Sequence, residues 1–183
     1  MKKKLIVLIL IILLIVAGVL LWKYFKEEEQ SNFTEYTPQE EISEEQARQS
    51  LVTLYFVNKE SKTLMPEARL IDAKLLATNP YFTLVSLLIN GPKNEKLETT
   101  IPAGTKLNKV VVEKDMAIVD LSEEFIKDIK LGAEEESKIV YSIVNTLVEL
   151  TEIESVKILI DGKENMAFAD KAIRFEKPFV KID

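Results

Sequence analysis

The sequence predicts an α+β domain of two layers, with the element order β-β-α-β-β-α-β and two amphipathic helices on one face of a sheet, preceded by an N-terminal transmembrane helix. Three observations support this fold class. Residues 5–22 carry no charge, five later segments are short runs of β-branched and aromatic residues, and two segments repeat apolar residues at helical spacing.

The composition excludes several classes of function. The 183 residues suit one domain with appendages. The chain has 24 Lys+Arg and 30 Asp+Glu; without the three lysines of the first 22 residues, 21 basic and 30 acidic residues remain, a net charge of −9. Such a domain is repelled by nucleic acid, which we therefore exclude as a partner. The chain has no His and no Cys, which removes disulfides, thiol chemistry, zinc sites built on these residues and the commonest general base. We predict no catalytic residue, no cofactor site and no metal site.

Residues 5–22 are predicted to be the transmembrane helix. Of these 18 residues, 15 are Leu, Ile or Val. At roughly −0.3 to −0.6 kcal/mol each, they favour insertion by about 5 to 9 kcal/mol. A helix of this length reaches about 27 Å, close to the thickness of the hydrocarbon layer. Residues 1–4, with Lys2, Lys3 and Lys4, form a basic end that predicts a cytoplasmic N-terminus and an extracytoplasmic domain.

A cleaved signal peptide is the alternative for this segment. It would have a shorter apolar run followed by a small-x-small cleavage site. Here the small pair Ala17 and Gly18 lies inside the apolar run, and bulky residues follow it. We therefore predict an uncleaved single-pass anchor in the cell membrane, followed by residues 23–46 as an acidic, solvated tether.

The domain is predicted to span residues 47–164 and to begin with two strands. Residues 51–58 are rich in β-branched and aromatic residues and end in a polar cluster, which indicates a buried strand and a turn. Residues 67–75 form a weaker second strand, with Pro66 at its start. The two are expected to form a hairpin or to lie side by side.

Residues 79–90 are predicted to form the first amphipathic helix. Asn79 can cap it, and Pro80 suits the first helical position, where no N–H is needed. Gly91 stands where a left-handed residue ends a helix, and Pro92 prevents continuation. A phosphate-binding loop precedes a helix, whereas this glycine follows one, so we interpret it as a stop signal.

A connector and a hairpin are predicted next. Residues 99–107 are irregular and contain a turn at Pro102 and Gly104. Residues 110–112 and 117–121 are apolar runs around a polar turn, which is typical of a β-hairpin.

The second half of the domain is predicted to be two helices and a strand. Ser122 can cap a short helix. Residues 132–150 have the widest apolar stripe, which must face a sheet. Residues 155–162 form a last strand that ends in the turn pair Asp161 and Gly162. Residues 165–183 are too apolar for a disordered tail, and we expect this C-terminal extension to pack at the domain edge.

Six segments together resemble a known family. The segments are LYF at 54–56, LLINGP at 87–92, IPAGTKL at 101–107, VDLSEEF at 119–125, IVNTL at 143–147 and ILIDG at 158–162. In that order and spacing they resemble the GerMN domain of sporulation and spore-germination GerM proteins, over about residues 51–164. We assign the following residues to its structural motif: Gly91, Pro92, Pro102, Gly104, Asp120, Ser122, Asn145, Asp161 and Gly162.

The resemblance implies a non-enzymatic extracytoplasmic domain related in fold to the ring-building motifs of membrane-spanning assemblies. GerM-like proteins look like assembly factors in the envelope between mother cell and forespore. This chain departs from the pattern because it has a single such domain, and a hydrophobic helix in place of a lipid-modified cysteine.

Several residues also admit a chemical interpretation. Asp120, Glu123 and Glu124 could supply a carboxylate pair for glycoside hydrolysis, but acids at a helix start are stabilising in themselves. Ser122 with a lysine could form a nucleophile pair, but so many serine–lysine pairings are possible in the chain that this one is uninformative. Asp161 with Gly162 could bind calcium, but no spaced series of oxygen ligands follows, and a turn is favoured. The aromatic residues all lie on predicted elements, where core packing is favoured over a sugar-stacking platform.

The predicted function is that of a non-enzymatic, membrane-anchored interaction and assembly module, an envelope scaffold. Its expected partners are the membrane, through residues 5–22, and other envelope proteins or a second copy of itself. The alternative is a module that binds or hydrolyses peptidoglycan.

Overall fold

The computed structural model describes residues 14–23 and 48–181. The chain divides into two compact units, residues 1–43 and 44–183. Residues 14–23 are helical. Within the described ranges, no helix has both the length and the apolar character needed to cross a membrane. Residues 1–13 and 24–47 lie outside these ranges. With them lie the whole basic end, the first half of the anchor and nearly all of the tether, which stay predictions.

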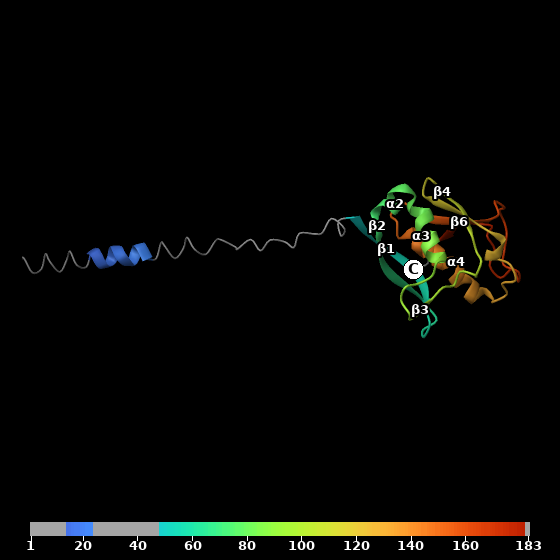
Figure 1. The fold of residues 1–183 in the computed structure, drawn as a ribbon, viewed down its shortest axis with the longest axis horizontal. Coiled ribbons are helices and arrows are strands. Elements are labelled where there is room, and N and C mark those ends of the chain that lie inside the picture. The colour runs from blue at the N-terminus through green and yellow to red at the C-terminus, as the bar shows by residue number, and fades with distance from the viewer. Residues whose placement is uncertain (1–13, 24–47, 182–183) are drawn as a thin grey trace, which may run out of the picture. The chain divides into compact units, whose positions relative to one another are not determined.

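The domain is a mixed α+β fold, as predicted (Figure 1). Its strands form two sheets, with the orders β2-β1-β3 and β4-β5-β6-β7. The elements are β1 (Gln49–Asn58), β2 (Leu64–Asp72), α2 (Ala73–Thr78), α3 (Pro80–Ile89), β3 (Leu97–Glu98), β4 (Leu107–Glu113), β5 (Met116–Leu121), the 3-10 helix η2 (Glu123–Phe125), α4 (Ala133–Val148), β6 (Ser155–Ile160) and β7 (Phe179–Val180).

The prediction of a single sheet was wrong. Strand β1 pairs antiparallel with β2 and β3, whereas β5 pairs antiparallel with β4 and parallel with β6. Helix α4 makes the crossover from β5 to β6, as a parallel pair requires. The strands β1 to β3 thus pair among themselves, and so do β4 to β7, so the two sets do not need to share one sheet.

The two helices join the two sheets. Helix α3 contacts β1 and β4, and α4 contacts α3, β1 and β6. A single apolar cluster runs through these contacts, and its most buried members come from both sheets, both helices and the segment after β6. Its largest fully buried side chains include Leu54, Phe56, Leu84, Leu88, Leu121, Phe125, Ile143, Leu147, Ile158, Phe168 and Phe175.

Strand β2 differs from its prediction at both ends. It begins at Leu64, so Pro66 lies inside the strand, opposite Tyr55. Proline is tolerated there because β2 is the outer strand of its sheet. The strand ends at Asp72, whose Oδ1 accepts a hydrogen bond from Lys74 N–H at 2.9 Å and so caps α2. The predicted strand of residues 67–75 was therefore wrong at its C-terminal end.

Helix α3 follows its prediction closely. Asn79 Oδ1 accepts from Phe82 N–H at 3.1 Å, and Pro80 occupies the first turn. After the last turn, Gly91 has φ +85° and its N–H donates to Leu88 O at 3.0 Å. Gly91 is thus the left-handed residue that ends the helix.

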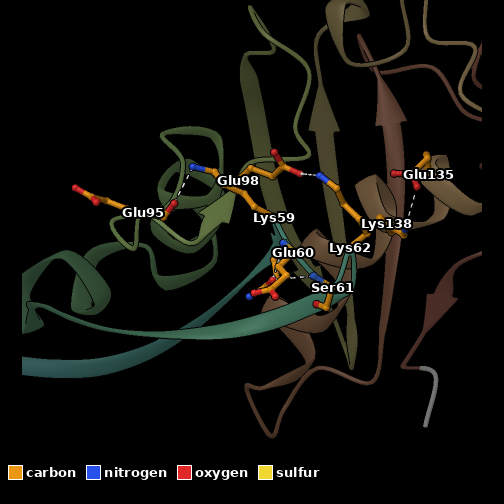
Figure 2. Close-up of polar contacts among 9 residues, drawn as sticks. Lys59, Glu60, Ser61, Lys62, Glu95, Glu98, Glu135 and Lys138 are labelled. Carbon is orange, nitrogen blue, oxygen red and sulfur yellow. Dashed lines mark hydrogen bonds and ion pairs between the residues drawn. The ribbon is translucent and has the colours of Figure 1, made fainter.

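The tip of the β1–β2 hairpin is held by side chains (Figure 2). Asn58 Oδ1 accepts from the N–H groups of Glu60 and Ser61, at 2.9 and 3.0 Å. Lys62 forms an ion pair with Glu98 of β3 at 2.9 Å. The exposed tip is thereby fixed against the short third strand of its sheet.

Helix α4 also completes the edge of β1. Strand β3 pairs with β1 at Val57 and Asn58. Further along β1, Tyr55 N–H donates instead to the Oγ1 of Thr146, a fully buried residue of α4, at 3.0 Å. The side chain of Thr146 therefore satisfies a backbone donor that the short β3 leaves unpaired.

Replacing Thr146 by valine is expected to lower the free energy of unfolding by about 1–3 kcal/mol, because the shape is kept and Tyr55 N–H loses its acceptor. Chemical denaturation measures the change. Thr83→Val is the control, since the Thr83 hydroxyl donates to Leu75 O at an exposed site and its loss should matter less. Equal effects of the two substitutions would contradict this role of Thr146.

Candidate functional site

The nine motif residues fall in three places. Gly91 and Pro92 follow α3, and Asn145 lies on α4. The other six gather where β5 and β6 end: Pro102, Gly104, Asp120, Ser122, Asp161 and Gly162. Parallel strands end at the same edge of a sheet, so this gathering follows from the β5–β6 pairing.

Asp120 and Asp161 tie the ends of β5 and β6 together. Asp120 Oδ1 accepts from Gly162 N–H at 2.8 Å, and Asp161 N–H donates to Leu121 O at 2.8 Å. Asp161 has φ +48° and Gly162 has φ +72°, so the chain turns sharply after β6. Both aspartates thus serve the turn, and in the part of the chain that the structure describes no group of three acidic side chains could hold a metal ion.

Ser122 links the connector before β4 to the end of β5. Its Oγ accepts from Lys106 N–H at 3.0 Å, and its own N–H donates to Lys106 O at 2.9 Å. The predicted side-chain cap was wrong, because this oxygen makes no cap hydrogen bond to η2. A hydrogen bond from Ser122 holds the pKa of the Glu124 carboxyl below its ordinary value. A hydroxyl engaged in this way is a structural group rather than a poised nucleophile.

The turn before β4 is closed by a threonine. The N–H and Oγ1 of Thr105 both donate to Pro102 O, at 3.2 and 2.7 Å. Gly104 has φ +84°, and a Cβ at this position would lie 3.8 Å from Glu124 Cγ, so the glycine serves the backbone conformation rather than a close approach. Hydrogen bonds of Ser122 thus join the connector to the end of β5, that of Asp120 joins β5 to the turn after β6, and Pro102 and Gly104 shape the turn that leads into β4.

The loop after α3 holds a carboxylate from the protein itself. Glu67 Oε2 accepts from the N–H groups of Lys93 and Asn94, at 2.9 and 2.8 Å. Glu67 Oε1 pairs with Arg69, whose Nη2 also donates to Gly91 O at 3.1 Å. Glu67 and Arg69 are 8% and 5% exposed, so the ion pair is buried. The Gly-Pro loop is both a helix stop and a cradle for Glu67.

The electrostatics of Glu67 reflect this cradle. Burial alone would raise the pKa of its carboxyl, but the hydrogen bonds from Asn94 N–H, Arg69 and Lys93 N–H outweigh burial and lower it. The Arg69 guanidinium also lies over the Phe56 ring, 5.8 Å from its centroid. The sequence analysis missed the Glu67–Arg69 ion pair. Its signal was two oppositely charged residues two positions apart, which therefore lie on one face of a strand.

Asn145 lines a groove beside α4. Its Oδ1 is buried and finds no hydrogen-bond partner among the residues that the structure describes. The groove has a volume of about 460 Å³ and is lined by Leu64, Ala133, Glu134, Ser137, Lys138, Tyr141 and Asn145. Lys138 Nζ forms ion pairs with Glu135 Oε1 at 2.6 Å and with Glu134 Oε1 at 3.3 Å. The hydrogen bond to Glu135, and after it the one to Glu134, raises the pKa of Lys138. The lysine is thus a charged partner in a surface network, not a base ready to react.

A second buried carboxyl was also missed. Glu136 in the first turn of α4 is fully buried, and its Oε2 accepts from Ile173 N–H at 3.2 Å. Within residues 14–23 and 48–181, no donor reaches its Oε1. Burial, and then the neighbouring Asp170 carboxylate, raise the pKa of Glu136. The Asp170 carboxylate accepts hydrogen bonds from the N–H groups of Ala172 and Gly132, at 3.0 and 3.2 Å. These bonds lower the pKa of Asp170, and the bond from Ala172 has the largest effect. Both burial and the Asp170 carboxylate therefore favour the protonated form of Glu136.

Replacing Glu136 by glutamine is expected to remove a loss of stability at high pH. The raised pKa means that the folded protein binds the proton more tightly, so stability is full below the ordinary glutamate pKa and falls as pH rises through the raised value. Asp170 acts oppositely, and its contribution is lost as pH falls through its lowered pKa. Glutamine keeps an acceptor for Ile173 N–H and cannot ionise.

Denaturation at pH 4, 6 and 8 tests this expectation. The parent and Glu136→Gln should agree at pH 4, and the variant should be the more stable at pH 8. Glu134→Gln, an exposed residue of the same turn, is the control and should follow the parent. Parallel pH profiles for the parent and Glu136→Gln would contradict the protonated form.

Together these features define a mixed α+β domain whose polar motif residues brace loops and strand ends. The chain belongs to the Germane family, described as sporulation and spore germination, whose model matches residues 53–165. This assignment confirms the resemblance read from the six segments.

Solved structures agree on the fold. The chain is similar to the tandem GerMN domains of the sporulation protein GerM from Bacillus subtilis, with 21% identity and a TM-score of 0.62, over 74% of this chain and 47% of that one. It thus spans about half the length of the tandem structure. It is also similar to the first GerMN domain of the same protein, with 24% identity and a TM-score of 0.60, over 73% of this chain and 99% of that one. No curated protein matches the sequence.

Proposed function

We propose that the protein is a non-enzymatic envelope scaffold, anchored in the membrane by residues 5–22, whose extracytoplasmic domain binds other envelope proteins or itself. The observation that carries this proposal is the family match over residues 53–165, whose description is sporulation and spore germination. The uncharged run of residues 5–22 supports the anchor.

The use of the polar residues supports an interaction role. Asp120, Ser122 and Asp161 make hydrogen bonds within the domain. Asp120, one of the three acids that suggested a hydrolase, is therefore committed to the turn after β6. What the domain offers to a partner is its surface, above all the outer strands of its sheets, whose backbone groups can pair with an added strand.

The position of the domain at the membrane is the property to test. Export of residues 43–183 without the anchor is expected to abolish function, because a scaffold acts at high effective concentration on one surface. Replacing residues 1–22 with an unrelated single-pass anchor should restore it. Function is scored in the native host as spore formation and germination. Equal function of the free and tethered domains would overturn the scaffold proposal.

Purified peptidoglycan separates the scaffold from the alternative. The outer domain is expected neither to release soluble products nor to sediment with the wall. Product release would establish a hydrolase, and tight sedimentation a wall-binding module.

A further inference from the structure

Strand β2 presents an unpaired edge whose geometry can be derived. Tyr55 lies opposite Pro66, and Tyr55 N–H points away from β2, toward Thr146. In an antiparallel pair, residues alternate between facing the partner strand and facing away from it. Pro66, Ala68 and Leu70 therefore direct their backbone groups away from β1. Among the described strands, none pairs with that side of β2.

This edge is accessible and partly apolar. Pro66, Ala68 and Leu70 are exposed, and Leu70 lies directly opposite the exposed Leu51 of β1. A groove of about 640 Å³ follows the edge and is lined by Leu51, Pro66, Glu67, Ala68, Arg69, Leu70, Lys93 and Asn94. The residue pairs between β1 and β2 are continuous from Gln49–Asp72 to Val57–Leu64, so no bulge turns the edge away from a partner.

We propose that the edge binds a second copy of this chain, with the two β2 strands antiparallel about a two-fold axis at Ala68. The two Ala68 residues would exchange two hydrogen bonds, and each Leu70 N–H would donate to Pro66 O of the other copy. The missing N–H of Pro66 is the sole gap in that ladder. Two three-stranded sheets become one continuous sheet. This inference deepens the proposed interaction function and rests on it for the role of the dimer.

The charges of β2 select this register. With the axis at Ala68, Glu67 of each copy faces Arg69 of the other, and opposite charges across a strand pair are favourable. A shift of one step in one direction places Glu67 against Glu67, and a shift in the other places Arg69 against Arg69. A further shift would oppose two prolines, which cannot donate. Within each copy Glu67 and Arg69 already form a buried ion pair, so in this register the two ion pairs lie side by side with opposite charges facing each other, and the edge is complementary to itself, as a two-fold interface requires.

Disulfide formation in the full chain tests the dimer, since the protein has no cysteine of its own. Opposed residues of a hydrogen-bonded pair lie about 5.5 Å apart between Cα atoms, within reach of a disulfide. In membranes of the expressing cell, Ala68→Cys is expected to form at least tenfold more disulfide dimer than Ala103→Cys. Ala103 is equally small and exposed but lies in the turn before β4. Adding Leu70→Lys to Ala68→Cys should reduce the cross-link at least tenfold.

Equal cross-linking of Ala68→Cys and Ala103→Cys, with both chains retaining the parent's unfolding temperature, would overturn the dimer. An unchanged yield in the Leu70→Lys variant would overturn the proposed register. Suppose that Ala68→Cys stays monomeric, while the anchored chain supports spore formation and germination and the free domain does not. The dimer proposal is then wrong, and the scaffold proposal stands. If the dimer forms but the free domain works as well as the tethered one, the dimer stands and the scaffold fails.

Discussion

Replacing Arg69 by methionine is expected to lower the free energy of unfolding by about 3–5 kcal/mol, among the largest effects of any single substitution in this domain. Methionine fills a similar volume but leaves the Glu67 carboxylate buried without its cation. It also removes the hydrogen bond to Gly91 O and the contact with the Phe56 ring. Urea denaturation of residues 43–183, with the slope checked against the parent, measures the loss.

The partner substitution turns this result into a test of the ion pair itself. Glu67→Gln keeps an acceptor for Lys93 and Asn94 N–H but removes the charge. The double variant Glu67→Gln with Arg69→Met should lose less than the sum of the two single losses, because the second change removes a group that the first left unpaired. Additive losses would mean that Arg69 stabilises the domain by packing alone.

Replacing Phe175 by alanine is expected to cost about 3–5 kcal/mol as well. Phe175 is fully buried, and its ring centroid lies 5.3 Å from that of Phe168 and 6.2 Å from those of Phe125 and Phe179. Its removal would leave a cavity among these three rings. Phe175 lies beyond residue 165, where the family match ends, so a large loss would make the C-terminal segment part of the folding unit.

The exposed Val180, in β7, is the matched control for that segment. It is 57% exposed, and Val180→Ala should change stability by about 0.5 kcal/mol or less. Thermal and chemical unfolding of both variants give the comparison. A loss below about 1 kcal/mol for Phe175→Ala would mean that the segment packs on a core that is complete without it.

Local signals explain what could be predicted from the sequence. The cap at Asn79, the proline at position 80 and the left-handed Gly91 act within a few residues of each other, and α3 was predicted almost to its ends. The hairpin of β4 and β5 and the helix α4 follow from periodicity in the same way. The strand–helix boundary at Asp72 was missed because apolar residues continue through α2, and the capping aspartate was its sole local signal.

Long-range partners explain what could not be predicted. Glu67 is cradled by loop residues 26 and 27 positions away, and Tyr55 N–H finds its acceptor 91 positions away. Ser122 was identified as a polar residue of note, but its partner is Lys106, 16 positions earlier. The division into two sheets could not be predicted for the same reason, because the composition of a strand does not indicate which other strand it pairs with.

The long register between β1 and β2 has a mechanical consequence. Any pull from the N-terminal side of the chain enters the domain at Gln49, the first residue of β1, and acts along that strand. The pairs run unbroken from Gln49 opposite Asp72 to Val57 opposite Leu64. If the resisting load is carried by β2, all of these hydrogen bonds are strained together in shear instead of opening one after another. The first strand of the domain is thus attached in the geometry that best withstands tension.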